Sequence, residues 1–224
     1  MKKAIFLFLI LFVCSFNNIH AQNQYGLTSG KIVFEISYMN DKLDAQTKAM
    51  MPTETVMYFK DKKSRVNMSM SMGTTSIISD DATKKSTVLM DFMGQKIAME
   101  STYEDNKKEM KKSGDFTVEK LVGSKKIAGY NCKKAKVTQK QKGENFSFDV
   151  WYSDEIGVNN AGTNGFEGID GCMLEYEMFQ NGTHMKMTTK SISKEDVKDS
   201  MFIIPDGYTM TTPEALKSMM GGGR

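Results

Sequence analysis

Residues 65–72 read Arg-Val-Asn-Met-Ser-Met-Ser-Met. Apolar side chains stand at every second position of this stretch, and polar side chains fill the positions between them. Because an extended strand sends alternate side chains to opposite faces, the stretch predicts a β-strand with one apolar and one polar face. Three of its four apolar side chains are methionines, which are flexible and polarizable. Such a face suits an adaptable apolar cavity, a soft metal, or an ordinary core.

The same alternation recurs along most of the chain. It predicts further strands over residues 31–38, 55–60, 74–79, 87–90, 95–99, 117–122, 131–139, 146–152, 172–180 and 183–190. Short polar turns join many of these strands, and Asn181-Gly182 is the strongest two-residue hairpin signal. Because consecutive hairpins build an antiparallel sheet and a sheet of about ten strands must curl, we expect a mainly β fold with one curved antiparallel sheet.

Helical signals are few and short. Residues 41–51 are compatible with a helix, and the charged residues 103–115 predict a solvated loop or a short helix. Ser193 with Asp196 resembles a capping box that opens a turn through Ser200. Residues 214–220 follow Thr-Pro and precede glycine, so they predict a short C-terminal helix.

The first 21 residues have the pattern of a secretory signal peptide, with a basic start, a short apolar run and Ala21 at the end. Cleavage after Ala21 would leave residues 22–224, which we expect to form one β-rich domain in the periplasm or outside the cell. Cys14 raises lipid anchoring as an alternative, although Phe12 and Val13 before it are bulky. No later segment is long and apolar enough to span a bilayer.

The charge balance excludes a polyanionic partner. The chain has 30 Lys and Arg residues against 27 Asp and Glu residues, whereas a nucleic-acid-binding protein needs a basic surface. Cys132 and Cys172 are an even pair in a compartment that permits disulfides. If residues 146–152 lie between their strands, the pair is about 9–10 Å apart, too far for a bridge.

Catalytic patterns are absent from the sequence. Beyond the predicted signal peptide, His184 is the only histidine, and every Ser-His-Asp or Cys-His device would need it. No glycine-rich phosphate loop, HExxH or Cys-x-x-Cys sequence occurs. We therefore expect a protein that is not an enzyme and needs no cofactor.

Four segments resemble a known family. Residues 126–135 (Lys-Ile-Ala-Gly-Tyr-Asn-Cys-Lys-Lys-Ala) are similar to its signature, and the likeness continues through 150–156 (Val-Trp-Tyr-Ser-Asp-Glu-Ile), 174–177 (Leu-Glu-Tyr-Glu) and 201–208 (Met-Phe-Ile-Ile-Pro-Asp-Gly-Tyr). The family consists of secreted bacterial proteins and is known as domain of unknown function 4412. The resemblance gives a family without a mechanism.

The second half of the chain also resembles the periplasmic carriers and receptors of lipoproteins, the LolA/LolB-like proteins. It shares their order of a strand ending in Trp-Tyr-Ser-Asp, a loop, a hairpin, a polar turn and Phe-x-x-Pro-x-Gly. The resemblance implies an unclosed barrel whose concave side is apolar, is covered by helices and holds acyl chains. The cavity arginine of the carriers has no counterpart here, because Arg65 is the only internal arginine.

We accordingly expect an exported, non-catalytic protein that shelters a hydrophobic small molecule, a lipid or an acyl chain. The candidate lining residues are apolar or aromatic positions on alternating strands: Phe34, Ile36, Tyr58, Met68, Met70, Leu89, Phe148, Tyr152, Leu174, Tyr176, Met178 and Met187. The glycine-rich segment 157–171 is the candidate gate.

Two alternatives remain open. Met68, Met70 and Met72 form a run of the kind that could bind Cu(I) through thioethers. Methionine is frequent throughout the chain, with 20 residues, so the same run fits a general apolar interior. The other alternative is a structural protein of the cell envelope that contacts an envelope partner and holds no ligand.

Overall fold

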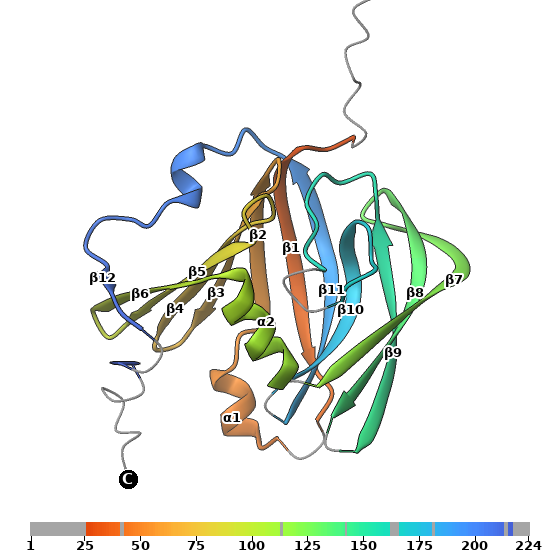
Figure 1. Cartoon of the computed structure of the whole chain (residues 1–224), viewed down its shortest axis with the longest axis horizontal. Helices are drawn as coiled ribbons and strands as arrows, with labels where there is room; N and C mark the ends of the chain where they lie inside the picture. Colours follow the sequence, from red (N-terminus) through yellow and green to blue (C-terminus); the bar gives the residue numbers. More distant parts are fainter. Residues whose placement is uncertain are drawn as a thin grey trace, which may run out of the picture.

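The computed structural model describes residues 26–40, 43–112, 114–141, 143–161, 166–180, 182–212 and 215–216. A single twelve-stranded sheet curls through this part of the chain (Figure 1). The strands of its first half are β1 (Ser29–Tyr38), β2 (Glu54–Lys60), β3 (Lys63–Met70), β4 (Gly73–Asp80), β5 (Lys85–Phe92) and β6 (Gln95–Ser101). The remaining strands are β7 (Asp115–Ile127), β8 (Tyr130–Gln141), β9 (Glu144–Ser153), β10 (Cys172–Gln180), β11 (Thr183–Lys194) and β12 (Thr209–Met210).

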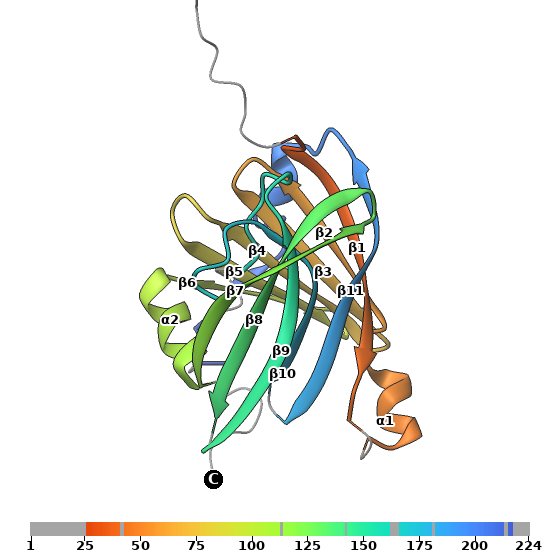
Figure 2. The same cartoon turned by 90° about the vertical axis from the view of Figure 1, so that its right-hand side faces the viewer.

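The strand order leaves the sheet open at both ends. It runs β12-β6-β5-β4-β3-β2-β1-β11-β10-β9-β8-β7, so the first and last strands of the main series, β1 and β11, meet in the middle. All neighbours are antiparallel except β12, which pairs parallel with β6. The two ends of the sheet, β12 and β7, do not pair with each other, and the sheet is not closed into a barrel (Figure 2). The predicted fold class is confirmed.

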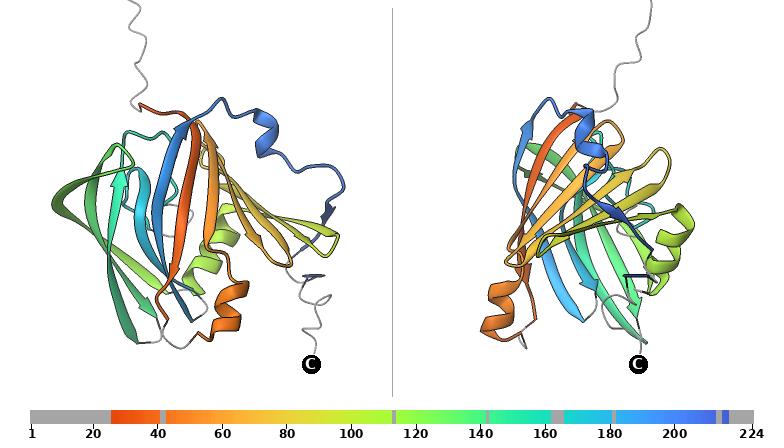
Figure 3. Two further views of the ribbon diagram at one scale, coloured as in Figure 1. Left: turned by 180° about the vertical axis from the view of Figure 1, so that it is seen from behind. Right: turned by 90° about the vertical axis from the view of Figure 1, so that its left-hand side faces the viewer.

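Each face of the sheet has its own hydrophobic cluster. The larger cluster lies on the concave side and includes Phe34, Met57 and Phe59. The smaller cluster lies on the outer face of the β2–β6 half, where Leu89 and Ala98 pack under Phe202. Phe202 belongs to the short helix η2 (Asp199–Phe202), and Figure 3 shows this C-terminal segment crossing the outer face. Strand alternation lets β2 contribute to both clusters, with Met57 and Phe59 in the larger one and Tyr58 packed against the smaller one.

Arg65 holds the C-terminal segment that contains η2 against the outer face of the sheet by a hydrogen bond. Its guanidinium donates to the Met201 carbonyl (3.3 Å), to Ser76 Oγ (3.3 Å) and to Asn67 Oδ1 (3.0 Å). Because Arg65 alternates with Ser64 and Val66 on β3, its side chain leaves the sheet on the side away from the concave face. The only internal arginine thus has a structural contact on the outer face.

Three local expectations need correction or qualification. β3 ends at Met70, so Met72 lies in the following turn and is 65% exposed. The capping box at Ser193 is wrong, because β11 continues to Lys194 and Ser193 Oγ donates to Glu195 Oε1 instead. The predicted signal peptide and residues 214 and 217–220 of the predicted C-terminal helix lie outside the described residues.

Helices α1 and α2 fall where short helices were compatible with the sequence. α1 (Ala45–Met50) begins at Asp44, whose carboxylate accepts the Thr47 N–H at 2.8 Å. α2 (Tyr103–Lys112) lies across the open side of the sheet (Figure 1). In the described part of the chain, no helix has the length and apolarity needed to span a membrane.

Cys132 and Cys172 are unbridged and buried. β9 lies between their strands, as the spacing argument required. Burial raises the pKa of Cys132 to about 11 and raises the pKa of Cys172 as well.

We expect both thiols to resist labelling in the native protein, because burial blocks access and the raised pKa leaves little reactive thiolate below pH 11. At pH 8, a two-unit rise alone lowers the thiolate fraction about 100-fold. Iodoacetamide labelling followed by mass measurement checks this expectation. Denaturation in urea should expose two labelled cysteines, and fast labelling without denaturant would contradict the buried placement.

Candidate functional site

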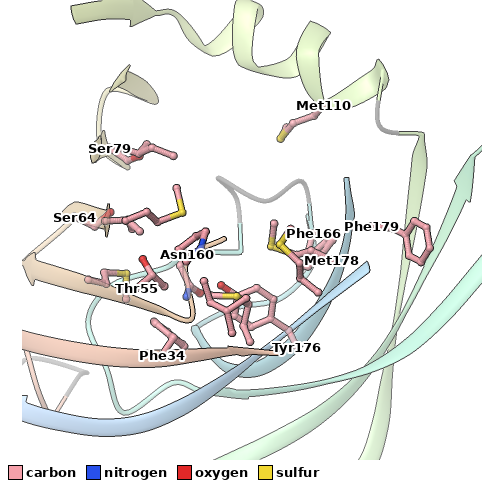
Figure 4. Close-up of a pocket in the computed structure, with 18 of the residues that line it drawn as sticks. Phe34, Thr55, Ser64, Ser79, Met110, Asn160, Phe166, Tyr176, Met178 and Phe179 are labelled. Carbon is pink, nitrogen blue, oxygen red and sulfur yellow. The ribbon is translucent and has the colours of Figure 1, made fainter. Parts of the chain in front are cut away.

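The concave side of the sheet encloses a cavity of about 330 Å³. Its floor comes from β1, β2 and β3, one wall comes from β10 and β11, and α2 contributes from the open side (Figure 4). Aromatic side chains from several elements surround it: Phe34, Tyr38, Phe116, Phe166 and Tyr176. Phe179 of β10 borders the cavity, but its ring points away from it toward His184 (Figure 4). The aliphatic lining residues are Ile36, Pro52, Val66 and Ile77.

Methionine is the most frequent residue type in the lining. Six methionines from five elements contribute to it: Met57, Met68, Met110, Met178, Met185 and Met187. Their positions follow from strand pairing, since Ile36 pairs with Met187 and Tyr38 pairs with Met185 across β1 and β11. Unbranched thioether side chains can change rotamer to fit differently shaped ligands. The interior is therefore apolar and adaptable.

Polar lining residues are few, and Thr55 and Asn160 among them are hydrogen-bonded within the protein. The polar lining residues are Thr55, Ser64, Ser79, Gln139 and Asn160. Thr55 Oγ1 donates to the Asn67 carbonyl at 2.9 Å. Asn160 accepts from the Met173 N–H at 2.7 Å and donates to the Met173 carbonyl at 3.2 Å. Asn160 thus pins the segment after β9 onto β10 and shapes the cavity wall.

α2 covers the cavity without burying any side chain fully. Met110 points from the helix toward the cavity, opposite Phe34 and Tyr176 from the sheet (Figure 4). Ser86 Oγ of β5 donates to Asn106 Oδ1 at 3.1 Å, which ties the helix to the sheet. The N-terminal turn is capped by Thr102 and Asp105, which exchange hydrogen bonds. A helix held by so few contacts can move with a low free-energy cost.

The twelve residues predicted to line a cavity fall into two groups. The structure brings six together around the cavity: Phe34, Ile36, Met68, Tyr176, Met178 and Met187. Their contact with a ligand stays a prediction.

The other six lie elsewhere. Tyr58 and Leu89 belong to the cluster on the outer face, because they alternate with inward-facing neighbours on β2 and β5. The side chains of Phe148, Tyr152 and Leu174 are packed inside the larger core cluster rather than lining the cavity. Met70 is half-buried at the end of β3, where it pairs with Gly73 beyond the cavity lining.

The run Met68, Met70 and Met72 does not form one face. Met68 lines the cavity, whereas Met72 lies in the exposed turn after β3. The alternation of the sequence continues past the point where the strand ends, and the backbone turn breaks it. The thioethers that gather in space come instead from strands far apart in sequence.

His184, the histidine considered for catalysis, and the neighbouring acidic residues Glu175 and Glu177 lie on the outer face of β10 and β11. His184 Nε2 is 2.7 Å from Glu177 Oε2, and both residues alternate with inward-facing methionines. Burial raises the pKa of Glu175, but hydrogen bonds from Lys125 and Lys186 outweigh this effect and leave it below its ordinary value. Within the described residues, no three His, Cys, Asp or Glu side chains gather as metal ligands.

Several lining residues escaped sequence reasoning. Met110 stands in a helix dense in charge, and Phe166 stands in the glycine-rich segment 157–171. Residues 162–165 of this candidate gate lie outside the described residues, while Asn160 and Phe166 on either side line the cavity. The signal in the sequence that could have identified Met110 and Phe166 is that each is an apolar residue isolated among charged residues or glycines.

Comparisons with known proteins give a family and remote likenesses to solved structures. The model of the family described as Domain of unknown function (DUF4412) matches residues 45–162, which is more than half of the 224 residues. The match includes segments 126–135 and 150–156 that resembled the family in sequence and ends before 174–177. A search of curated proteins found no match.

Two of the solved structures that this chain resembles are mycobacterial proteins. The lipoprotein LppX of Mycobacterium tuberculosis has 9% identity and a TM-score of 0.38, and the alignment covers 77% of this chain and 90% of LppX. LprF from Mycobacterium bovis has 12% identity and a TM-score of 0.35, with 83% of this chain and 92% of LprF covered. At these values neither likeness bears on function.

Proposed function

Because the chain belongs to the family described as Domain of unknown function (DUF4412), whose description names no activity, we propose a function from the cavity itself. The protein binds a hydrophobic ligand, an acyl chain or a lipid, on the concave side of its sheet. It does so without catalysis and without a cofactor, as a single domain.

The methionine-lined cavity carries this proposal. Its volume of about 330 Å³ lies within the range of small-molecule sites, which are concave, mostly apolar and carry few polar groups. A well-packed core of the same composition would leave few voids larger than a water molecule. Burying apolar ligand surface here would contribute roughly 25 cal/mol per Å² before the costs of association.

The compartment is part of the proposal. The N-terminal pattern of residues 1–21 supports export and cleavage after Ala21. An apolar ligand needs a carrier or a shelter in an aqueous compartment such as the periplasm, because its transfer into water is unfavourable. A partner in the cell envelope would then supply or receive the ligand.

Titration with a fluorescent fatty acid tests the binding function. We expect saturable binding with one site per chain and a dissociation constant in the micromolar range or lower, about 8 kcal/mol of binding free energy. Unlabelled dodecanoate should displace the probe competitively. Absence of saturable fluorescence change, with correctly folded protein, would argue for an envelope protein that holds no ligand.

Binding of Cu(I) is the second candidate function, favoured by six thioethers around one cavity. Competition with a chromophoric Cu(I) chelator measures it. The triple variant Met68→Leu, Met70→Leu and Met72→Leu removes only one of the six cavity methionines, Met68. Its Cu(I) affinity should therefore be largely retained if the cavity binds the metal, and should be lost if the sequence run binds it. Unchanged chelator absorbance with the wild-type protein would exclude this candidate.

A further inference from the structure

A second chamber adjoins the apolar cavity. It has a volume of about 340 Å³ and lies between α2 and the turn that joins β4 to β5. Four residues line both spaces: Ser64, Ile77, Ser79 and Met110. The two chambers therefore meet at a shared threshold, with Met110 of α2 on one side and β3 and β4 on the other.

The second chamber has a different chemistry from the first. Tyr103, Asn106 and Met110 present one face of α2 to it, as their helical spacing allows. Charged side chains from the sheet edge and the neighbouring loop surround the remainder: Lys62, Asp80, Asp81, Lys84, Lys85 and Glu167. The apolar cavity thus opens into a chamber whose lining, unlike its own, includes charged residues.

Most acidic groups of this chamber are already engaged. Asp81 pairs with Lys84, and Glu109 of α2 pairs with Lys112. Asp80 accepts the backbone N–H groups of Ala82 and Thr83.

Lys62 and Lys85 differ from these groups. Among the described residues, neither lysine has a carboxylate within ion-pair distance. The Asp81 N–H donates to the Lys62 carbonyl at 2.9 Å, which holds the β2–β3 turn beside the β4–β5 turn. Lys85 pairs with Asp80 in the strand register. Two lysines without an ion pair therefore stand at this chamber. Of the two carboxylates there that have no ion pair within the described part of the chain, Asp80 is already engaged by backbone N–H groups and Glu167 is not.

We propose that the ligand is an amphiphile with an anionic head group, whose chain occupies the methionine-lined cavity and whose carboxylate or phosphate is held by Lys62 and Lys85. This inference rests on the proposed function and specifies its ligand class. A chain that passes the threshold at Met110 places its head between α2 and the β4–β5 turn. Lysine ammonium groups act there as point charges for the anion.

A series of probes with the same twelve-carbon chain tests the head group. Dodecanoate, dodecyl phosphate, dodecanol and dodecyltrimethylammonium compete in turn against the fluorescent fatty acid. We expect one or both anionic probes to bind roughly 3- to 10-fold tighter than dodecanol, because exposed ion pairs are individually weak. The preference should shrink at high ionic strength. The anionic probe that binds tighter separates a fatty-acid head from a phosphate head.

The double variant Lys62→Gln with Lys85→Gln should remove this preference and leave dodecanol binding unchanged. The matched control, Lys140→Gln with Lys194→Gln, makes the same change of charge at exposed positions outside both chambers and should keep the preference. Equal binding of all four probes, or tightest binding of dodecyltrimethylammonium, would overturn the anionic head group while leaving the binding function intact. If none of the probes binds, the proposed function itself fails.

Discussion

Replacing Val66 by Trp is expected to weaken binding of the fluorescent fatty acid by about 10-fold or more, which corresponds to at least about 1.4 kcal/mol. Val66 lies on β3 with its side chain toward the cavity, between Ser64 and Met68 on the same face. An indole at this position would fill a large part of a cavity of about 330 Å³. The ligand would then have to displace a well-packed side chain.

Val56→Trp is the matched control for this variant. Val56 lies on the adjacent strand β2, pairs with Asn67 and is also half-buried, but it alternates with the inward-facing Thr55 and Met57. The same residue change on the opposite face should leave the dissociation constant within about twofold. Equal loss in both variants would point to general unfolding, and full binding by Val66→Trp would contradict a ligand in this cavity.

Phe59→Ala is expected to lower the free energy of unfolding by about 3–5 kcal/mol. The Phe59 side chain is fully buried in the larger cluster, outside the cavity lining. Its ring lies against Gly30, where an added Cβ would come 3.2 Å from Phe59 Cζ and 2.4 Å from the Ser193 carbonyl oxygen. The absence of a side chain at Gly30 thus lets β1, β2 and β11 pack closely around this ring, and removal of the ring leaves a cavity at the centre of the sheet.

Urea unfolding followed by circular dichroism measures the loss. Ile203→Ala provides a comparison, because Ile203 is 60% exposed and its truncation should change the free energy by less than about 0.5 kcal/mol. A loss below about 1 kcal/mol for Phe59→Ala would show that the middle of the sheet does not depend on this contact. The expected order of stability is wild type, then Ile203→Ala, then Phe59→Ala.

The fold was predictable because its signal is local. Alternation along β3 and its neighbours gave the strands, and short polar turns gave the hairpins, since each turn fixes the pairing of two consecutive strands. β12 was missed because it has two residues, Thr209 and Met210, and pairs with a strand far away in sequence. No local pattern encodes such a pairing.

Only six of the twelve predicted lining residues line the cavity. Alternation identifies the two faces of a strand, but it does not show which face the sheet encloses. Tyr58 and Met57 are neighbours on β2, yet Met57 lines the cavity and Tyr58 packs under the C-terminal segment. The outer face is itself apolar where η2 covers it, so hydrophobicity does not distinguish the faces. Met110 and Phe166 line the cavity because the tertiary fold brings α2 and the segment after β9 over the sheet. The periodicity of the sequence contains no information about this arrangement.

Native mass spectrometry of the protein purified from its own cell envelope tests the central claim most directly. The account predicts a polypeptide that begins at Gln22 and carries an additional mass of one hydrophobic compound, which organic extraction removes. The Val66→Trp variant, prepared in the same way, should carry much less of this mass, and Val56→Trp should carry as much as the wild type. A bare polypeptide mass, together with no binding of the fluorescent fatty acid, would contradict the account.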